Sequence, residues 1–141
     1  MVVYYSRSGN TKRLADAVAA QKGESAFALA PKKPEGMFLG AAKSFLRRAT
    51  EVRELPVLTG GEAVVLCTPV WAGTFPPVVR GFLQSAILQG RAVTLLLTCG
   101  DLSAAYDMKL SAELQKMGVT TSVCRVFRGK ASPAPEELAG L

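Results

Sequence analysis

A hydroxyl- and glycine-rich segment near the start of the chain has the residue types that bind a phosphate. It reads SRSGNT at positions 6–11, between an apolar β-rich run and a segment with helical spacing. The first N–H groups of a helix have no intrahelical partner, and the helix dipole adds partial positive charge there. The hydroxyls of Ser6, Ser8 and Thr11 add donors, and Gly9 permits a tight turn around an anion. The segment predicts a phosphate site, with a merely capped strand-to-helix turn as the structural alternative.

Two later loops carry residues suited to contact a flat ligand. Residues 68–76 hold the only tryptophan, Trp71, beside glycine and just before a predicted helix, and residues 98–101 follow the most apolar predicted strand. A phosphate-binding turn and two such loops suggest a phosphorylated, flat heteroaromatic ligand. Simpler interpretations stay open: Trp71 as a core aromatic, Cys99 as a small apolar filler, and Asp101 as the cap of the fourth helix.

Composition limits the remaining chemistry. The chain has 141 residues, which we interpret as one domain covering 1–141, and 49% of them are hydrophobic. No histidine is present, which excludes imidazole acid–base catalysis and histidine-ligated metal sites. Three cysteines without CxxC spacing argue against a disulfide framework and favour a reducing, cytoplasmic location.

Charge and hydropathy point to no membrane insertion and no nucleic-acid site. No apolar run reaches the roughly 18 residues of a spanning helix, and no basic-then-apolar leader precedes the first strand. The net charge of +6 is spread over predicted helices and loops without a nucleic-acid-binding motif. It indicates a solvated surface biased toward acidic partners or anionic ligands.

Strand-like and helix-like segments alternate along the whole chain, which predicts right-handed crossovers and a doubly wound α/β sheet covered on both faces. In such sheets ligands bind outside the carboxyl ends of the strands, which is where the three candidate loops fall. Strands are predicted at 2–5, 26–29, 63–67, 92–98 and 121–127, and helices at 10–22, 37–49, 76–88 and 103–117.

The predicted helix at 37–49 is basic and amphipathic. Such a segment can lie on a membrane surface or bind a partner. Because its apolar face is short and sits inside the domain, we expect an ordinary helix that covers the sheet.

Two motifs resemble the flavodoxin family. VVYYSRSGNT followed by a helix is similar to that family's FMN phosphate loop, and TPVWAGTFPPVVRGFL is similar to the second flavin loop and the helix after it in small flavodoxin-like oxidoreductases. The resemblance covers nearly the whole chain in element order. It implies a three-layer, five-stranded parallel sheet in the order 2-1-3-4-5, with FMN at the switch point between the first and third strands, an arrangement for which flavodoxin is the type example.

The resemblance also implies roles for individual residues. The first loop would hold the phosphate, the second would border the flavin ring with a backbone carbonyl at Ala72 or Gly73 facing N5, and the third would meet the pyrimidine edge. An Asp101 carboxylate near N1 would lower the reduction potential. The implied cofactor-binding residues are Ser6, Arg7, Ser8, Gly9, Asn10, Thr11, Pro69, Val70, Trp71, Ala72, Gly73, Thr98, Cys99, Gly100 and Asp101.

The chain departs from the family pattern in three ways. It is basic, whereas electron-shuttling flavodoxins are typically acidic, and the nearest aromatic to the third loop is Tyr106, which leaves one ring face open. After the last predicted strand only 14 residues remain, interrupted by Pro133 and Pro135, so the last helix is expected to be short or missing. A sheet face left uncovered predicts a homodimer, which gel filtration would test.

These patterns predict an FMN-binding electron-transfer protein or oxidoreductase. Its partner would be a redox protein or a small acceptor such as a quinone, and a quinone reductase-like enzyme would oxidise NAD(P)H directly. The alternative is a flavodoxin-fold interaction or regulatory module that no longer binds flavin.

Overall fold

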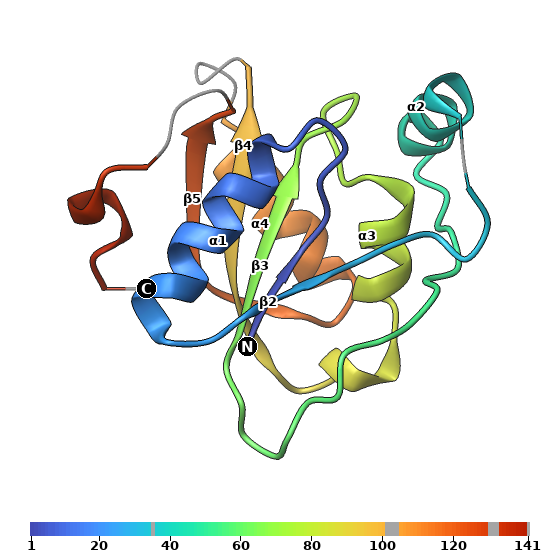
Figure 1. Ribbon diagram of the computed structural model, residues 1–141. Helices are drawn as coiled ribbons and strands as arrows, with labels where there is room; N and C mark the ends of the chain where they lie inside the picture. The colour runs from blue at the N-terminus through green and yellow to red at the C-terminus, as the bar shows by residue number, and fades with distance from the viewer. Residues whose placement is uncertain (35, 101–104, 130–132, 141) are drawn as a thin grey trace.

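A computed structural model describes residues 1–34, 36–100, 105–129 and 133–140, and its centre is a five-stranded parallel sheet (Figure 1). The strand order is β2-β1-β3-β4-β5, which confirms the order that the resemblance implies. The strands are β1 (Val2–Tyr4), β2 (Ala26–Ala28), β3 (Val64–Pro69), β4 (Ala92–Cys99) and β5 (Thr120–Arg128). The helices are α1 (Asn10–Lys22), α2 (Met37–Phe45), α3 (Pro77–Leu83) and α4 (Tyr106–Lys116), with 3₁₀ turns η1 (Ala86–Leu88) and η2 (Pro135–Leu138).

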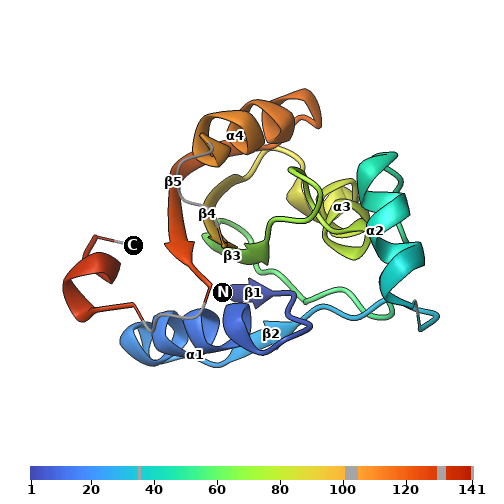
Figure 2. The same cartoon turned by 90° about the horizontal axis from the view of Figure 1, so that it is seen from above.

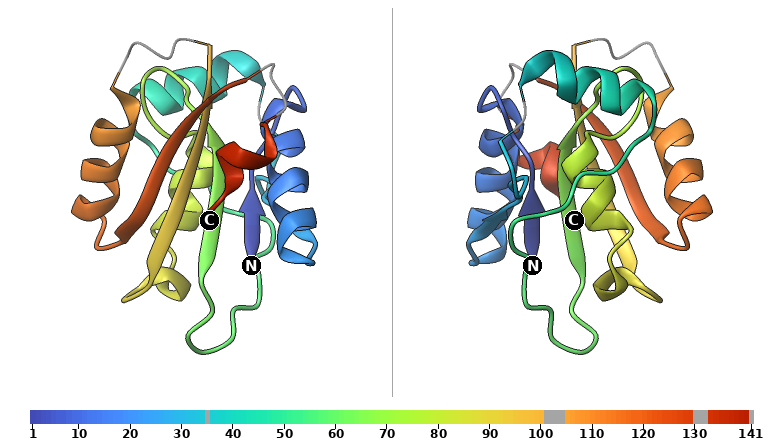
Figure 3. Two further views of the ribbon diagram at one scale, coloured as in Figure 1. Left: turned by 90° about the vertical axis from the view of Figure 1, so that its left-hand side faces the viewer. Right: turned by 90° about the vertical axis from the view of Figure 1, so that its right-hand side faces the viewer.

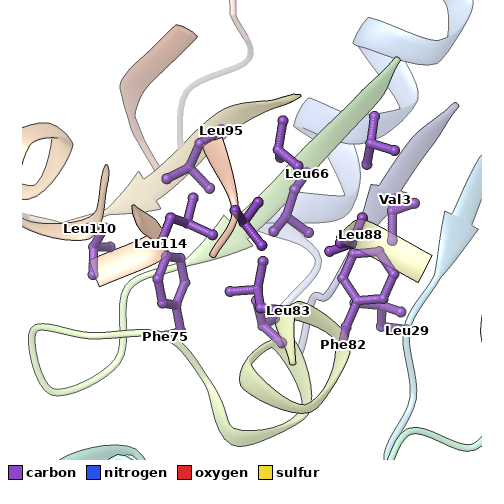
Figure 4. Packing of buried hydrophobic residues seen from close by; sticks show 14 of the residues in the cluster. Val3, Leu29, Leu66, Phe75, Phe82, Leu83, Leu88, Leu95, Leu110 and Leu114 are labelled. Carbon is purple, nitrogen blue, oxygen red and sulfur yellow. The ribbon is translucent and has the colours of Figure 1, made fainter. Parts of the chain in front are cut away.

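Helices cover both faces of the sheet, as the alternating pattern predicts. α3 and α4 lie on one face, and α1 and η2 on the other (Figure 2). β3 and β4 are apolar at nearly every position because both of their faces are buried. The larger core cluster fills the α3 and α4 side (Figure 4) and includes Val3, Leu66, Phe75, Phe82, Leu83, Leu95, Leu110 and Leu114.

The helix boundaries follow local chemistry. α1 ends at Gly23, whose φ of 66° is the left-handed conformation that glycine adopts without strain. α3 begins at the predicted proline pair, with Pro76 as N-cap and Pro77 as first helical residue. The predicted single helix at 76–88 is wrong in its second half. The Ser85 hydroxyl donates to the carbonyl of Phe82, the backbone turns extended at Ser85, and only the turn η1 follows.

The last helix is short, as predicted. The turn η2 lies over the same face as α1 (Figure 3), and its Leu138 is buried in the smaller core cluster. Arg125 of β5 holds this turn by donating to the carbonyls of Glu137 (2.6 Å) and Ala139 (3.1 Å). The hydroxyls of Thr94 on β4 and Ser122 on β5 form an exposed hydrogen bond, so no helix or turn of the described residues covers the sheet at this point. The homodimer stays a prediction.

The prediction that the helix at 37–49 covers the sheet is wrong. α2 ends at Phe45 and packs against α3 at the side of the molecule (Figures 1 and 2). Gly40 and Ser44, one turn apart, form its buried side, and the Trp71 ring lies directly against Gly40. Within the described ranges, no helix is both long enough and apolar enough to cross a membrane.

The segment between α2 and β3 packs closely against Gly81 of α3. A Cβ at Gly81 would lie 2.1 Å from the backbone oxygen of Thr50, whose N–H donates to the Pro77 carbonyl. We therefore expect Gly81→Ala to lower the free energy of unfolding by about 1–3 kcal/mol or more, because backbone must shift to make room. Urea denaturation would measure the loss. Gly60→Ala is the matched control, since no heavy atom lies within 4 Å of its added Cβ; equal losses in both variants would contradict the prediction.

Candidate functional site

The three loops singled out in the sequence meet at one cavity at the carboxyl ends of the strands. The cavity holds about 430 Å³, within the roughly 300–1,000 Å³ range of small-molecule sites. Most predicted site residues line it; Ser6, Gly9, Ala72 and Gly73 do not. The lining residues are Arg7, Ser8, Asn10, Thr11, Pro69, Val70, Trp71, Thr98, Cys99, Gly100, Arg128 and Gly129.

The N-terminus of α1 lines the cavity with Asn10 and Thr11. Gly9, the N-cap, has φ 85°, a left-handed conformation that favours glycine, and no side chain caps the helix. No acidic residue lies in the first turn, and the Asn10 Oδ1 accepts from Arg13 Nη2 at 2.6 Å. The helix N-terminus therefore offers N–H groups and an uncompensated dipole to an anion. This differs from the capped turn that was the structural alternative.

Two predicted phosphate donors have other structural roles. The Ser6 Oγ accepts the N–H of Gly9 at 3.1 Å and so fixes the turn. The Thr11 hydroxyl pairs at 2.7 Å with that of Thr98, and both residues are buried. Since each hydroxyl carries one proton and the pair uses one, a second proton remains to donate. Ser8 is exposed and lines the cavity, so its hydroxyl is the side-chain donor best placed for a ligand.

The loop after β3 is a tight hairpin that presents Trp71. Trp71 and Thr74 exchange both backbone hydrogen bonds at 2.9 Å, and the two residues between them have positive φ, 48° at Ala72 and 70° at Gly73. These values define a type I′ turn, and at Ala72 they strain a residue that has a Cβ. The Lys109 ammonium lies close to this turn, since a Cβ at Gly73 would be 2.9 Å from its Nζ. Trp71 is half-buried and lines the cavity, so it is not a core aromatic.

A second cavity, of about 620 Å³, adjoins the first at Trp71. Its lining combines Arg7, Ser8, Val70 and Trp71, which both cavities share, with Ala41 of α2 and Ala72. The Trp71 and Tyr5 rings meet in a T-shaped arrangement at a centroid distance of 5.6 Å, and the Arg7 guanidinium lies over the Trp71 ring, 6.0 Å from its centroid. The indole therefore has both an aromatic and a cationic neighbour.

A buried ion pair anchors the hairpin, and sequence reasoning missed it. Arg80 of α3 and Glu113 of α4 are 4% and 7% exposed, and Arg80 Nη2 donates to Glu113. The hydroxyl of Thr74 accepts from Arg80 Nη2 at 2.7 Å and donates to the Glu113 carboxylate at 2.9 Å. The network joins the Trp71 hairpin to two helices. A lone arginine in the otherwise apolar stretch PVVRGFL is the sequence signal that indicates it.

The end of β5 also contributes to the cavity, and this too was missed. Arg128 and Gly129 line it, and the Gly129 N–H donates to the Cys99 carbonyl at 2.9 Å. A Cβ at Gly129 would lie 3.4 Å from the Asn10 Nδ2, an ordinary contact distance, so the end of β5 lies beside the α1 turn. The rule that ligands bind at strand carboxyl ends could have found both residues. Among the described lining residues the charged ones are Arg7 and Arg128, both basic, so the cavity favours an anion.

The third loop contributes Cys99 and Gly100, while Asp101 lies outside the described residues. α4 begins at Tyr106 with Ala105 as its N-cap, later than the predicted position 103. Tyr106 packs against the larger core cluster and does not line the cavity. Elsewhere, burial raises the pKa of the Cys67 thiol far above its ordinary value and also raises that of Cys124. Both thiols are therefore poor nucleophiles.

No family model and no curated protein matches this sequence. Solved structures do resemble it. A putative flavoprotein from Bacteroides uniformis shares 21% identity over 94% of this chain and 91% of its own, with a TM-score of 0.75. A flavoprotein in complex with FMN from Lactobacillus acidophilus shares 15% over 89% and 90%, with a TM-score of 0.71. Two-electron reduced flavodoxin from Megasphaera elsdenii shares 18% over 98% and 93%, with a TM-score of 0.59.

At this level of identity the likeness concerns the fold. The strand order β2-β1-β3-β4-β5, the helices on both faces and the cavity at the strand ends all agree with it. The chain has the flavodoxin-like fold.

Proposed function

We propose that this chain binds FMN in the 430 Å³ cavity and works as an electron-transfer flavoprotein or FMN-dependent oxidoreductase. The observation that carries the proposal is that one cavity is lined both by an uncapped helix N-terminus and by Trp71. This pairing suits a ligand with an anionic ester at one end and a flat ring system at the other. The FMN complex among the structural neighbours supports the same ligand.

In this proposal the phosphate binds at the turn before α1. The N–H groups of the first helical turn, the Ser8 hydroxyl and the remaining proton of the Thr11–Thr98 pair would donate to its oxygens. Arg128 and Arg7 would add attraction from the rim of the cavity. Ser6 would act indirectly, by holding Gly9 in place.

The flavin ring would lie between the Trp71 hairpin and the loop after β4. Trp71 would contact the ring, and backbone groups of Cys99 and Gly100 would meet the pyrimidine edge. The carbonyl facing N5 would be that of Ala72 or Gly73 in the turn of this hairpin, where Ala72 lines the adjoining cavity. Bound FMN would supply the redox chemistry, while the residues of the chain position it and set its electrostatic surroundings.

The electron acceptor would be a redox partner protein or a small acceptor such as a quinone. The second cavity, which shares Trp71 with the first, gives a small acceptor a place beside the flavin site. The positive surface suits an acidic partner protein or an anionic electron donor such as NAD(P)H.

Titration of the purified chain with FMN tests the proposal. Because Trp71 is the only tryptophan and lines the cavity, its fluorescence should be quenched in a saturable, one-to-one manner. The visible absorption band of the flavin should shift in parallel. A preparation that neither carries flavin nor responds to added FMN would overturn the proposal and favour the interaction-module alternative.

Removing the charge of Arg128 should weaken FMN binding in a salt-dependent way. We expect Arg128→Gln to lower FMN affinity several-fold at low ionic strength and less at high salt, because an exposed charge is screened by ions. Titrations at two salt concentrations measure the change. Arg53→Gln is the control, because Arg53 is exposed and does not line the cavity. An equal loss of FMN affinity in that variant would mean that the effect comes from the net charge of the protein and not from the cavity.

A further inference from the structure

The outward face of α2 is entirely apolar. At 100° per residue its exposed positions span an arc of about 160°, while the buried positions on the opposite side are Gly40 and Ser44. Phe38 is 90% exposed and Phe45 75% exposed. This is the reverse of an ordinary surface helix, which buries its apolar stripe. In order around the arc the exposed residues are Ala41, Phe45, Phe38, Ala42, Leu46 and Leu39.

Exposed cations lie at both ends of this face. Arg47 and Arg48 follow the C-cap residue Leu46, and Lys33 lies four residues before the first helical residue, Met37. Arg47 has φ 52°, and the N–H groups of Arg47 and Arg48 donate to the carbonyls of Ser44 and Lys43. In this type of helix ending, glycine is the unstrained residue at the position of Arg47. The chain thus carries a strained arginine directly after two exposed apolar side chains, Phe45 and Leu46.

We propose that the outward face of α2 docks on the surface of an anionic lipid bilayer. An apolar helical face with basic residues beside it has the character of an interfacial helix: phenylalanine and leucine enter the headgroup boundary and the arginines meet lipid phosphates. The positive charge around α2 complements that surface. The proposed contact is peripheral, because it uses one face of a single short helix.

Docking would bring the bilayer next to the candidate site. Ala41 belongs to the docking face and also lines the 620 Å³ cavity beside Trp71. The lipid surface would therefore adjoin that cavity. The proposal itself concerns lipid binding and does not depend on FMN being bound.

Vesicle co-sedimentation of the whole 141-residue chain tests the proposal, with and without added FMN. The chain should sediment with phosphatidylcholine vesicles that contain phosphatidylglycerol, and much less with phosphatidylcholine alone. Phe38→Ser combined with Phe45→Ser should lower partitioning by about tenfold for each phenylalanine. The net charge is unchanged, so simple attraction of a basic protein to the vesicles would persist in this variant.

Matched variants separate this surface from general effects. Val57 and Met108 are 84% and 70% exposed at sites away from α2, and their replacement by serine should leave vesicle binding unchanged. Arg48→Gln should weaken binding to anionic vesicles more than Lys116→Gln does. Because the two phenylalanines are mostly exposed, thermal unfolding of the double variant should match that of the parent chain.

Two results would overturn the proposal. One is equal sedimentation of the parent chain and the Phe38→Ser, Phe45→Ser variant. The other is absence of vesicle binding together with a dimer, seen by light scattering, that the same variant dissociates; α2 would then bind a second copy of the chain.

Discussion

Replacing Glu113 with glutamine is expected to lower the free energy of unfolding by about 3–5 kcal/mol. The change removes the charge that compensates Arg80, which stays buried at 4% exposure with its Nε atom already lacking a hydrogen-bond partner among the described residues. Glutamine keeps the shape of the side chain, so the loss reports the charge rather than a cavity. Urea denaturation of the two proteins measures it.

A double-mutant cycle gives the sharper test of this pair. Replacing Arg80 and Glu113 together with methionine removes both charges, and the double variant should lose far less stability than the sum of the single ones. Additive losses, or a Glu113→Gln protein within about 1 kcal/mol of the parent chain, would contradict the prediction.

The same network should matter for ligand binding. Thr74 closes the Trp71 hairpin and is bonded to both charged side chains. We therefore expect the folded Glu113→Gln protein, assayed well below its melting temperature, to bind FMN more weakly than the parent chain. Arg80 and Glu113 do not line the cavity, so such a loss would identify them as positioning residues.

FMN is expected to bind at least about a hundredfold more tightly than riboflavin, which lacks the phosphate. Two or more charge-assisted hydrogen bonds at the α1 N-terminus, at about 1.5–3 kcal/mol each, account for that difference. The uncapped turn, Ser8 and Arg128 are the groups that would provide them. Parallel titrations followed by Trp71 fluorescence measure both affinities.

Ser8→Ala should reduce this discrimination. Loss of one donor to a charged group lowers FMN affinity by about ten- to a hundredfold and leaves riboflavin affinity nearly unchanged. Ser25→Ala is the control, because Ser25 is exposed and does not line the cavity. Equal weakening of FMN and riboflavin by Ser8→Ala would mean that the phosphate binds elsewhere.

Local sequence was enough to predict most elements. The helix at 10–22 and its end at Gly23 follow from apolar spacing and from the ease with which glycine adopts positive φ. The strands were predicted to within two residues at each end, and the clearest signals were the apolar runs of β3 and β4, which are buried on both faces. Parallel strands end at a common edge, so the meeting of the first and third candidate loops with Trp71 was also predictable.

The α2 prediction failed for a physical reason. Its sequence, MFLGAAKSF, is apolar on nearly every side, so periodicity alone does not say which side faces inward. Gly40 lets this helix approach the Trp71 ring closely, Ser44 is buried on the same side, and that packing turns the phenylalanines outward. A contact between residues 31 positions apart in the chain decides the orientation, and no local pattern records it.

Sequence by itself determined the order of the elements, the turn before α1 and the loop that carries Trp71, because these follow from backbone geometry and from neighbouring residues. Tertiary structure alone decided that Arg80 meets Glu113 behind the hairpin and that α2 presents its apolar face to solvent. Each of these depends on contacts between residues distant in sequence, which form only when the sheet and its helices pack together.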